Sequence, residues 1–354
     1  MDARVSARKL FLEFVVLAMR ACQQAEKRCP RNGPGRKPVV PDWVMGTLVV
    51  VAVAARRKTK SAQFRYCWAH AEELKELGVW PLPKRSAFFD RYLRAWRLFQ
   101  VAIICEGKLA VRQKWADAES VSVDKSLIAA QGPPAHRRNG RPCRVRGADL
   151  EAGWGKSEYD GWVYGYGYEA VVSAGKRGPI WPLQASVEPA NRHESQMIRE
   201  KLPYLPRPTK AVLADKAYDA DDLTEAIEWR ADGRRTGRRF VCPLIQRCTA
   251  RRPPKRAWRR TRERQTRQAH RRARATFWKS RAGQRLYARR RVTAEPFNAW
   301  FKERFQLQQH VWHRGLDNNR TQILAAILSY QLVLHLNQLH DHSVGSITWL
   351  IDVL

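Results

Sequence analysis

Acidic side chains are scarce in this sequence. Its 354 residues include 66 Lys and Arg but only 33 Asp and Glu, so the formal net charge is +33. This excess is far beyond what solubility needs, and a polyanion is the partner that such a field attracts. An acidic protein or a membrane surface would also suit the charge, but the basic residues are interleaved with Trp and Tyr within a long chain. Nucleic acid is therefore the favoured partner.

Cysteine patterns that mark a metal site or a disulfide framework are absent. Seven Cys, an odd number, are scattered along the chain without a CxxC and without a Cys/His pair at zinc-ligand spacing. This usage indicates reduced thiols in a cytoplasmic protein.

Long hydrophobic runs are lacking as well. The apolar run at residues 10–22 is broken by Glu13 and Arg20, and the run at 44–55 has only 12 residues, below the ~18 that a membrane-crossing helix needs. Neither run follows the pattern of a signal peptide with a cleavage site. Both predict buried helices, and no membrane partner is expected.

The first 115 residues predict helices only. We expect these helices at residues 3–28, 43–57, 64–77 and 86–103. Ser86 can cap the fourth, whose apolar positions recur every three to four residues. Short helices joined by basic turns are typical of helix-turn-helix DNA readers. A helical dimerisation or packing domain explains the pattern equally well.

The pattern then changes to that of strands. Residues 120–128 alternate between apolar and polar side chains, with Asp124 on the polar face. A loop is expected over 131–161. It is followed by a hairpin whose strands are 162–174 and 179–189.

The first strand of this hairpin places four aromatic side chains on one face. They are Trp162, Tyr164, Tyr166 and Tyr168. Such a stripe could stack on nucleic-acid bases, but four aromatic residues on one strand face more often form core against a helix. Both interpretations stay open at this point.

A carboxylate stands where the next strand ends. Residues 211–214 are apolar without alternation, the pattern of a short strand that is covered on both faces. Asp215 follows them directly, and open α/β sheets place their ligands at the carboxyl ends of strands. The acids at 219–222 supply an N-cap and a first turn for the next helix. With a helix at 194–201 and a strand at 238–245, the order predicts a mixed sheet flanked by helices rather than a doubly wound repeat.

A basic run separates the last strand from a strong helix. Residues 247–291 hold 19 Lys and Arg and a single acid, Glu263. Such a run is usually solvated or disordered. A run that lies inside the fold, near a carboxylate site, suggests contact with a phosphate backbone.

The strong helix starts near Thr293 and carries a third acid. Glu295 and Lys302 are seven residues apart and share a helix face. Glu295 can therefore dock on the sheet beside Asp124 and Asp215.

Four segments, in this order, resemble the catalytic domain of insertion-sequence transposases of the DDE class, which have an RNase H-like fold. They are DKS at 124–126, the hairpin region at 161–195, VLADKAYD at 212–219 and RRRVTAEPFNAWFKERF at 289–305. The resemblance spans residues 118–340. Two further segments, at 35–55 and 84–96, are similar more loosely to the helical DNA-binding part of the same proteins.

The resemblance implies an α/β protein with two domains and a tail. We expect a helical, helix-turn-helix-like DNA-binding domain, an RNase H-like catalytic domain with a basic insertion, and a short C-terminal tail. Their expected bounds are 1–115, 116–340 with the insertion at 246–291, and 341–354.

The resemblance also implies an acidic triad, which maps onto Asp124, Asp215 and Glu295. The signature of Tyr, Arg, Glu and Lys in this family places Arg291 and Lys302 at the expected spacings around Glu295. Tyr287 lies one residue further from Arg291 than the pattern asks. The candidate DNA- and phosphate-binding residues are Arg291, Lys302, Tyr287, Arg290 and Lys216.

The chemistry of phosphodiester cleavage explains these residue types. Cleavage needs a strong nucleophile from water and a stabilised leaving oxygen, which two Mg²⁺ ions about 3.5–4 Å apart supply; Mn²⁺ is an expected substitute. Because Mg²⁺ prefers carboxylate and water oxygens, three acids from different elements suffice. Our hypothesis is that Asp124 bridges both ions while Asp215 and Glu295 hold one each. Arg291 and Lys302 would grip the phosphates of the cleaved strand.

The expected partners are double-stranded DNA, as terminal inverted repeats and as target, and a second copy of the chain when two ends are joined. The resemblance implies a bacterial cytoplasmic protein associated with the nucleoid. Two other functions stay open. One is a non-catalytic DNA-binding protein descended from a transposase, which loss of one acid would mark. The other is an RNA-binding basic protein, although the sequence has no RNP-type or KH-type motif.

Overall fold

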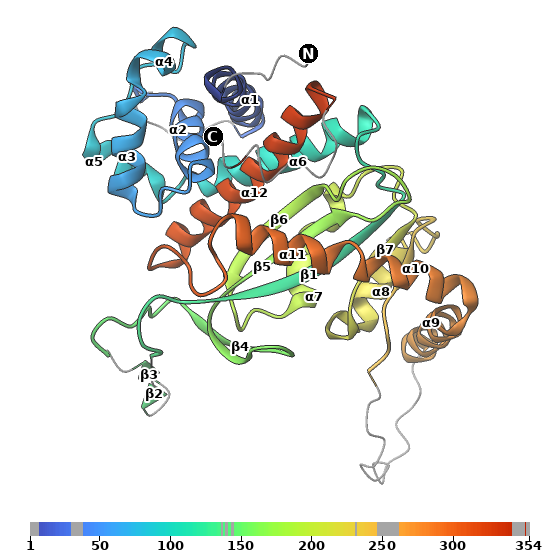
Figure 1. Ribbon diagram of the computed structural model, residues 1–354. Helices are drawn as coiled ribbons and strands as arrows, with labels where there is room; N and C mark the ends of the chain where they lie inside the picture. The colour runs from blue at the N-terminus through green and yellow to red at the C-terminus, as the bar shows by residue number, and fades with distance from the viewer. Residues whose placement is uncertain are drawn as a thin grey trace.

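A mixed sheet of six strands forms the centre of the described chain (Figure 1). The computed structural model describes residues 7–29, 38–135, 137–138, 141–142, 145–230, 232–245, 262–341 and 351. The strands of the sheet are β1 Ser120–Ala129, β4 Gly153–Ser157, β5 Gly161–Ser173, β6 Pro182–Pro189, β7 Ala211–Leu213 and β8 Arg239–Val241. A separate small pair is formed by β2 Arg137–Arg138 and β3 Arg141–Pro142.

The sheet combines antiparallel and parallel pairing. β1 pairs antiparallel with β5 and parallel with β7, and β7 pairs parallel with β8. β4 and β6 both pair antiparallel with β5, β4 with its residues up to Gly165 and β6 with those from Tyr166 onward. The structure therefore confirms the predicted mixed sheet. Its central strand, β1, begins with four buried residues, because other elements cover both of its faces there.

Within residues 7–29 and 38–119, which the structure describes, six helices precede the sheet and share one hydrophobic core with it. They are α1 Ala7–Arg28, α2 Asp42–Ala54, α3 Lys60–Ala69, α4 Ala71–Glu76, α5 Arg85–Tyr92 and α6 Trp96–Arg112. The helix α12 Leu316–Leu339 belongs to the same core. Gln331 of α12 donates from its Nε2 to the carbonyls of Ile103 in α6 and Pro182 in β6, at 3.0 and 2.6 Å. No helix among the described residues is long and apolar enough to span a membrane.

Two of the helices predicted in this part were wrong in extent. The third is divided at His70 into α3 and α4. The fourth is divided into α5 and α6. At the break the Thr321 hydroxyl of α12 replaces helical hydrogen bonds, because it donates to the Tyr92 carbonyl and accepts from the Trp96 N–H. Ser86 does not cap α5, which begins at Arg85 after Lys84 as its N-cap residue.

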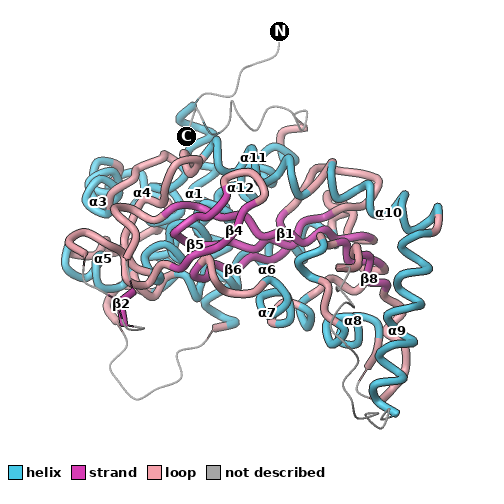
Figure 2. Tube along the Cα trace, turned by 90° about the horizontal axis from the view of Figure 1, so that it is seen from below, coloured by secondary structure: helices cyan, strands magenta, loops and turns pink. Residues whose placement is uncertain are grey.

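Helices cover both faces of the sheet. Figure 2 shows α11 (Ala294–Arg304) on one side of the strands and α7 (Glu194–Arg199) and α8 (Asp221–Glu228) on the other. Successive residues of β5 contact these opposite layers: the Tyr168 ring packs on Phe301 of α11, whereas the Glu169 carboxylate binds Lys201, which follows α7. The alternation of side chains along a strand therefore sets which residues reach the α11 side.

The aromatic stripe of β5 divides along its length. Tyr166 and Tyr168 are fully buried and belong to the core, whereas Trp162 is 67 % exposed. The core interpretation thus holds for Tyr166 and Tyr168, and Tyr168 packs against α11. Trp162 instead lies in the part of β5 that pairs with β4, where its partner in the ladder is Lys156.

The expected loop at 131–161 was wrong in part, because it contains β4. Glycines at 153 and 155 hide the strand pattern, yet both are needed for close packing. A Cβ on Gly155 would lie 2.8 Å from the Ala190 carbonyl oxygen, and one on Gly153 would lie 2.4 Å from the Asn191 side-chain oxygen. The backbone contact at Gly155 excludes any larger residue there, and it leaves no signal in the hydrophobic pattern.

The second half of the basic run is helical and packs on the sheet. It forms α9 Arg262–Lys279 and α10 Arg281–Arg291, while residues 246–261 lie outside the described residues. Ser280 caps α10 by accepting from the Gly283 N–H. Apolar side chains of this segment, Phe277, Trp278 and Leu286 among them, pack against residues of β7 and β8.

Asp219 was predicted to cap α8, and this was wrong. The N-cap residue is Ala220, without a side-chain cap. The Asp219 carboxylate is fully buried and pairs with two arginines of α9, Arg271 and Arg274, and it also accepts the N–H of Ile245. A carboxylate removed from water needs such partners, so Asp219 anchors α9 instead of starting α8.

Candidate active site

Two of the predicted acids project from neighbouring parallel strands at the same level. Ser122 of β1 pairs with Leu213 of β7; Asp124 and Asp215 each lie two residues further along. Asp124 is within β1, whereas Asp215 follows the end of β7 and caps a short 3-10 helix, with its Oδ1 accepting the Ala217 N–H at 2.8 Å. The parallel register therefore brings these two carboxylates to one place on the sheet.

The third acid reaches the same place from α11. Thr293 is the N-cap residue of α11, as the sequence predicts, and Glu295 is in its first turn. All three carboxylates lie around one guanidinium, that of Arg290 near the end of α10. Its Nη2 lies 2.7 Å from Asp124 Oδ1 and 4.0 Å from Asp215 Oδ2, and its Nη1 lies 3.1 Å from Glu295 Oε1.

Hydrogen bonds to buried side chains fix the orientation of the Asp124 carboxylate. Its second oxygen, Oδ2, accepts from Asn298 Nδ2 at 2.8 Å, and Asn298 Oδ1 accepts from the Tyr168 hydroxyl at 2.9 Å. Both Asn298 and Tyr168 are buried. Asn298 is a residue that the sequence reasoning missed. Its only signal was its position three residues after Glu295, which puts both on one face of the helix.

The carboxylates of this cluster need a nearby positive charge to stay ionised. Burial, together with the negative charges of Asp215 and Glu295, raises the pKa of Asp124 to about 6 against the lowering effect of Arg290. Burial also raises the pKa of Asp215. Three crowded carboxylates favour their charged forms only when positive charge is placed between them.

The transposase DDE domain family model matches residues 115–332, which is more than half of the chain. The chain belongs to this family. No curated protein and no solved structure matches it. The matched region runs from just before β1 into α12 and includes all three clustered carboxylates.

DDE transposases use divalent metal ions, and the donor set of this cluster suits such an ion. Carboxylate oxygens are hard ligands of the type that Mg²⁺ and Mn²⁺ take. The Arg290 guanidinium lies between these oxygens. Within the ranges that the structure describes, no three His, Cys, Asp or Glu side chains lie close enough together to hold a metal ion as they stand.

The residues predicted to bind phosphate are placed differently from one another. The Arg291 side chain is exposed, whereas Arg290 lies among the carboxylates of the DDE domain. Lys302 is half-buried: its Nζ donates to the Leu127 carbonyl at 2.7 Å, and burial lowers its pKa.

The other two candidates lie near the cluster. Tyr287 is partly buried and packs edge-on against Trp278. Lys216 is exposed and forms an ion pair with Glu158, in the turn between β4 and β5. The exposed turn of this hairpin therefore borders the Asp215 side of the site.

A buried ion pair supports Asp215 from the opposite face of the sheet. Lys201 Nζ lies 2.7 Å from Glu169 Oε1, and the Tyr218 hydroxyl donates to Glu169 Oε2 at 2.8 Å. Tyr218 belongs to the short 3-10 helix that Asp215 caps. This network holds the backbone after Asp215 in place.

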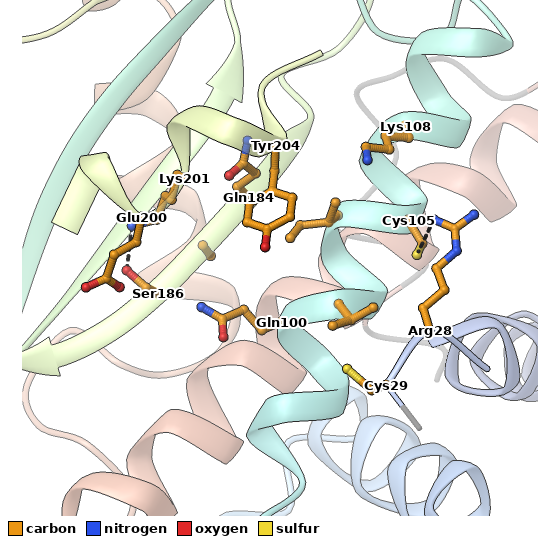
Figure 3. A pocket seen from close by; sticks show the side chains of 13 residues that line it. Arg28, Cys29, Gln100, Cys105, Lys108, Gln184, Ser186, Glu200, Lys201 and Tyr204 are labelled. Carbon is orange, nitrogen blue, oxygen red and sulfur yellow. Dashed lines mark hydrogen bonds between the residues drawn. The ribbon is translucent and has the colours of Figure 1, made fainter. Parts of the chain in front are cut away.

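A cavity of about 480 Å³ lies elsewhere, where α6 faces β6 and the segment after α7 (Figure 3). Arg28, Cys105, Gln184 and Tyr204 are among the side chains that line it. None of the predicted site residues lines this cavity. It is therefore not part of the carboxylate site.

Proposed function

We propose that the protein is an insertion-sequence transposase that binds the ends of its element, cleaves them by metal-dependent phosphodiester hydrolysis and transfers the resulting 3′-OH ends into target DNA. The observation that carries the proposal is the meeting of Asp124, Asp215 and Glu295 around one positive charge, in a chain of the transposase DDE domain family.

In this proposal Asp124, Asp215 and Glu295 would hold the Mg²⁺ ions, or Mn²⁺ in their place. Such ions lower the pKa of the attacking water and stabilise the leaving oxygen. Asn298 keeps Oδ2 of Asp124 engaged, so that Oδ1 faces the centre of the site. The protein part of the mechanism is thus positioning and charge.

Two displacement steps at phosphorus follow. In hydrolysis a water oxygen bonds to phosphorus at the element end, the bond to the 3′ oxygen breaks, and that oxygen takes up a proton and leaves as a 3′-OH. In strand transfer this 3′-OH loses its proton and bonds to a phosphorus of the target strand. A 3′ oxygen of the target then leaves and is protonated.

The proposed catalytic fold is RNase H-like and spans residues 116–340, with the basic insertion at 246–291. The strand order supports it: three antiparallel strands, β6–β5–β1, are continued by the parallel strands β7 and β8. Residues 1–115 are proposed as the helical, helix-turn-helix-like DNA-binding part, and 341–354 as a tail.

The proposed partner is double-stranded DNA, bound by a homodimer when two ends are joined. Basic side chains of α9 and α10 point in two directions. Arg271 and Arg274 are turned inward onto carboxylates, whereas Arg272, Lys279 and Arg291 are exposed. Arg291 lies next to Arg290 of the carboxylate cluster. The exposed set would contact the phosphate backbone, which predicts salt-sensitive binding.

A cleavage assay on DNA carrying the inverted repeats of the element tests the proposal. Asp215→Asn should abolish Mg²⁺-dependent cleavage and leave binding to the ends intact. Asp232→Asn is the matched control, because Asp232 is exposed in a loop outside the cluster, and should cleave like the wild type. Cleavage retained by Asp215→Asn would refute the assignment.

The alternative is a domesticated, non-catalytic DNA-binding protein. One observation favours it, since an internal arginine already neutralises the carboxylates. The presence of all three acids speaks against it, because loss of one would be its mark. Absence of cleavage by the wild type with both Mg²⁺ and Mn²⁺, together with tight binding to the ends, would decide for the alternative.

A further inference from the structure

We propose that Arg290 is an internal counter-cation that closes the carboxylate site of the free protein, and that a DNA phosphate draws it away so that divalent cations can enter. The inference deepens the proposed function and rests on it for one point, that the three carboxylates are the cation ligands.

The contacts of Arg290 use the oxygens that a metal ion would need. Nη2 donates to Asp124 Oδ1 and lies near Asp215 Oδ2, and Nη1 donates to Glu295 Oε1. The remaining oxygen of Asp124 is held by Asn298. A guanidinium and a divalent cation cannot occupy the same space between these oxygens, and their like charges repel. Binding of the ion and release of Arg290 are therefore one event.

The pairing of Arg290 is less complete than that of Lys201, which forms the buried ion pair on the opposite face of the sheet. Lys201 offers three ammonium protons and has three acceptors, Glu169, Ser186 and the Met197 carbonyl, at 2.7, 2.6 and 3.0 Å. Arg290 has a buried Nε with no hydrogen-bond partner among the described residues. An unsatisfied buried donor makes the closed arrangement less favourable than its ion pairs alone suggest.

The cluster is open on the side from which DNA would approach. Asp124 and Arg290 have side chains only 16 % and 11 % exposed, but Asp215 and Glu295 are 35 % and 45 % exposed. Arg291, the next residue, is exposed. A phosphate bound beside Arg291 would offer the Arg290 fork an acceptor of matching geometry. The side chain can then turn outward while α10 stays in place.

This arrangement couples the two ligands of the site. DNA that takes Arg290 raises the affinity of the carboxylates for divalent cations, and by linkage the cations raise the affinity for DNA. The free protein would then hold its metal ions weakly, and an assembled site would form only on a DNA strand. The device keeps a metal-dependent nuclease inactive away from its substrate.

The test is titration of the protein with Mn²⁺ alone, with free Mn²⁺ followed by EPR. Arg290→Gln should bind Mn²⁺ at least about tenfold more tightly than the wild type, as expected when a cation at this distance is removed from carboxylates. Arg285→Gln, an exposed position on the same helix, should bind like the wild type. Arg290→Lys keeps the charge but loses the forked guanidinium, and its Mn²⁺ affinity should lie between those of the wild type and Arg290→Gln.

Circular dichroism shows whether Arg290→Gln is folded. A second Mn²⁺ titration, in the presence of DNA, tests the proposal on the wild type itself. Addition of a short DNA duplex should raise the Mn²⁺ affinity of the wild type by a similar factor and that of Arg290→Gln much less. The role of Arg290 as counter-cation is overturned if the wild type and Arg290→Gln bind Mn²⁺ equally well without DNA. If the wild type still cleaves element ends in that case, the proposed function stands. Absence of both Mn²⁺ binding and cleavage in every protein, with DNA present, overturns both.

Discussion

The anchor of α9 gives the sharpest prediction about stability. The Asp219 side chain is 0 % exposed and that of Arg274 is 1 % exposed, so Asp219→Asn leaves a buried guanidinium without its counter-charge. Asparagine keeps the shape of the side chain, but both Asp219 oxygens accept hydrogen bonds, so one acceptor is lost together with the charge. Removing one partner of a buried pair costs about 3–5 kcal/mol, and we expect the free energy of unfolding to fall by that amount.

Asp221 supplies the matched control, because it binds the same helix through Arg271 but its side chain is 27 % exposed. An ion pair screened by water contributes at most about 1 kcal/mol. Urea unfolding followed by circular dichroism measures both variants, and limited proteolysis within α9 shows whether that helix loosens first. Equal losses for Asp219→Asn and Asp221→Asn would refute the reasoning that Asp219 is a buried anchor.

Three further predictions follow from other parts of the structure. Asn298→Ala should lower the cleavage rate by about 10- to 100-fold, because Asp124 loses the group that orients it; cleavage unchanged within twofold, with DNA binding intact, would contradict this. Burial lowers the pKa of His313 from 6.5 to about 3. The unfolded state therefore takes up a proton first as the pH falls, and stability should drop by about 2 kcal/mol between pH 6.5 and 5. A His313→Gln variant with the same pH dependence of stability would rule out His313 as the cause. Replacing the exposed Arg272 and Lys279 by Gln should weaken binding to any duplex and reduce the slope of log affinity against log salt by nearly two, whereas an unchanged slope would place DNA elsewhere.

Local patterns in the sequence were enough for the elements that carry the acids. The unbroken apolar run before Asp215 gave β7, the alternation around Asp124 gave β1, and the first turn after Thr293 gave α11. Each of these signals lies within a few residues of the acid that it places. The parallel pairing of β1 with β7, which brings two of the acids together, is not contained in these local patterns.

The features that were not predicted from the sequence depend on contacts that local patterns do not reveal. Asp219 has the local pattern of a helix cap, but its partner Arg274 lies 55 residues away. Family spacing favours Arg291, yet one residue on a helix turns the side chain by about 100°, and the structure turns Arg290 toward the acids. Likewise β4 is a strand because it pairs with β5, and its glycine at 155 allows close backbone contact, which no periodicity reveals.

Anomalous scattering from a crystal of the protein with DNA and Mn²⁺ tests the central claim most directly. We predict manganese peaks bound by Asp124, Asp215 and Glu295, with the Arg290 guanidinium moved out from between them onto a phosphate. Manganese bound elsewhere, or a DNA-bound site in which Arg290 still fills the space between the three carboxylates, would contradict it.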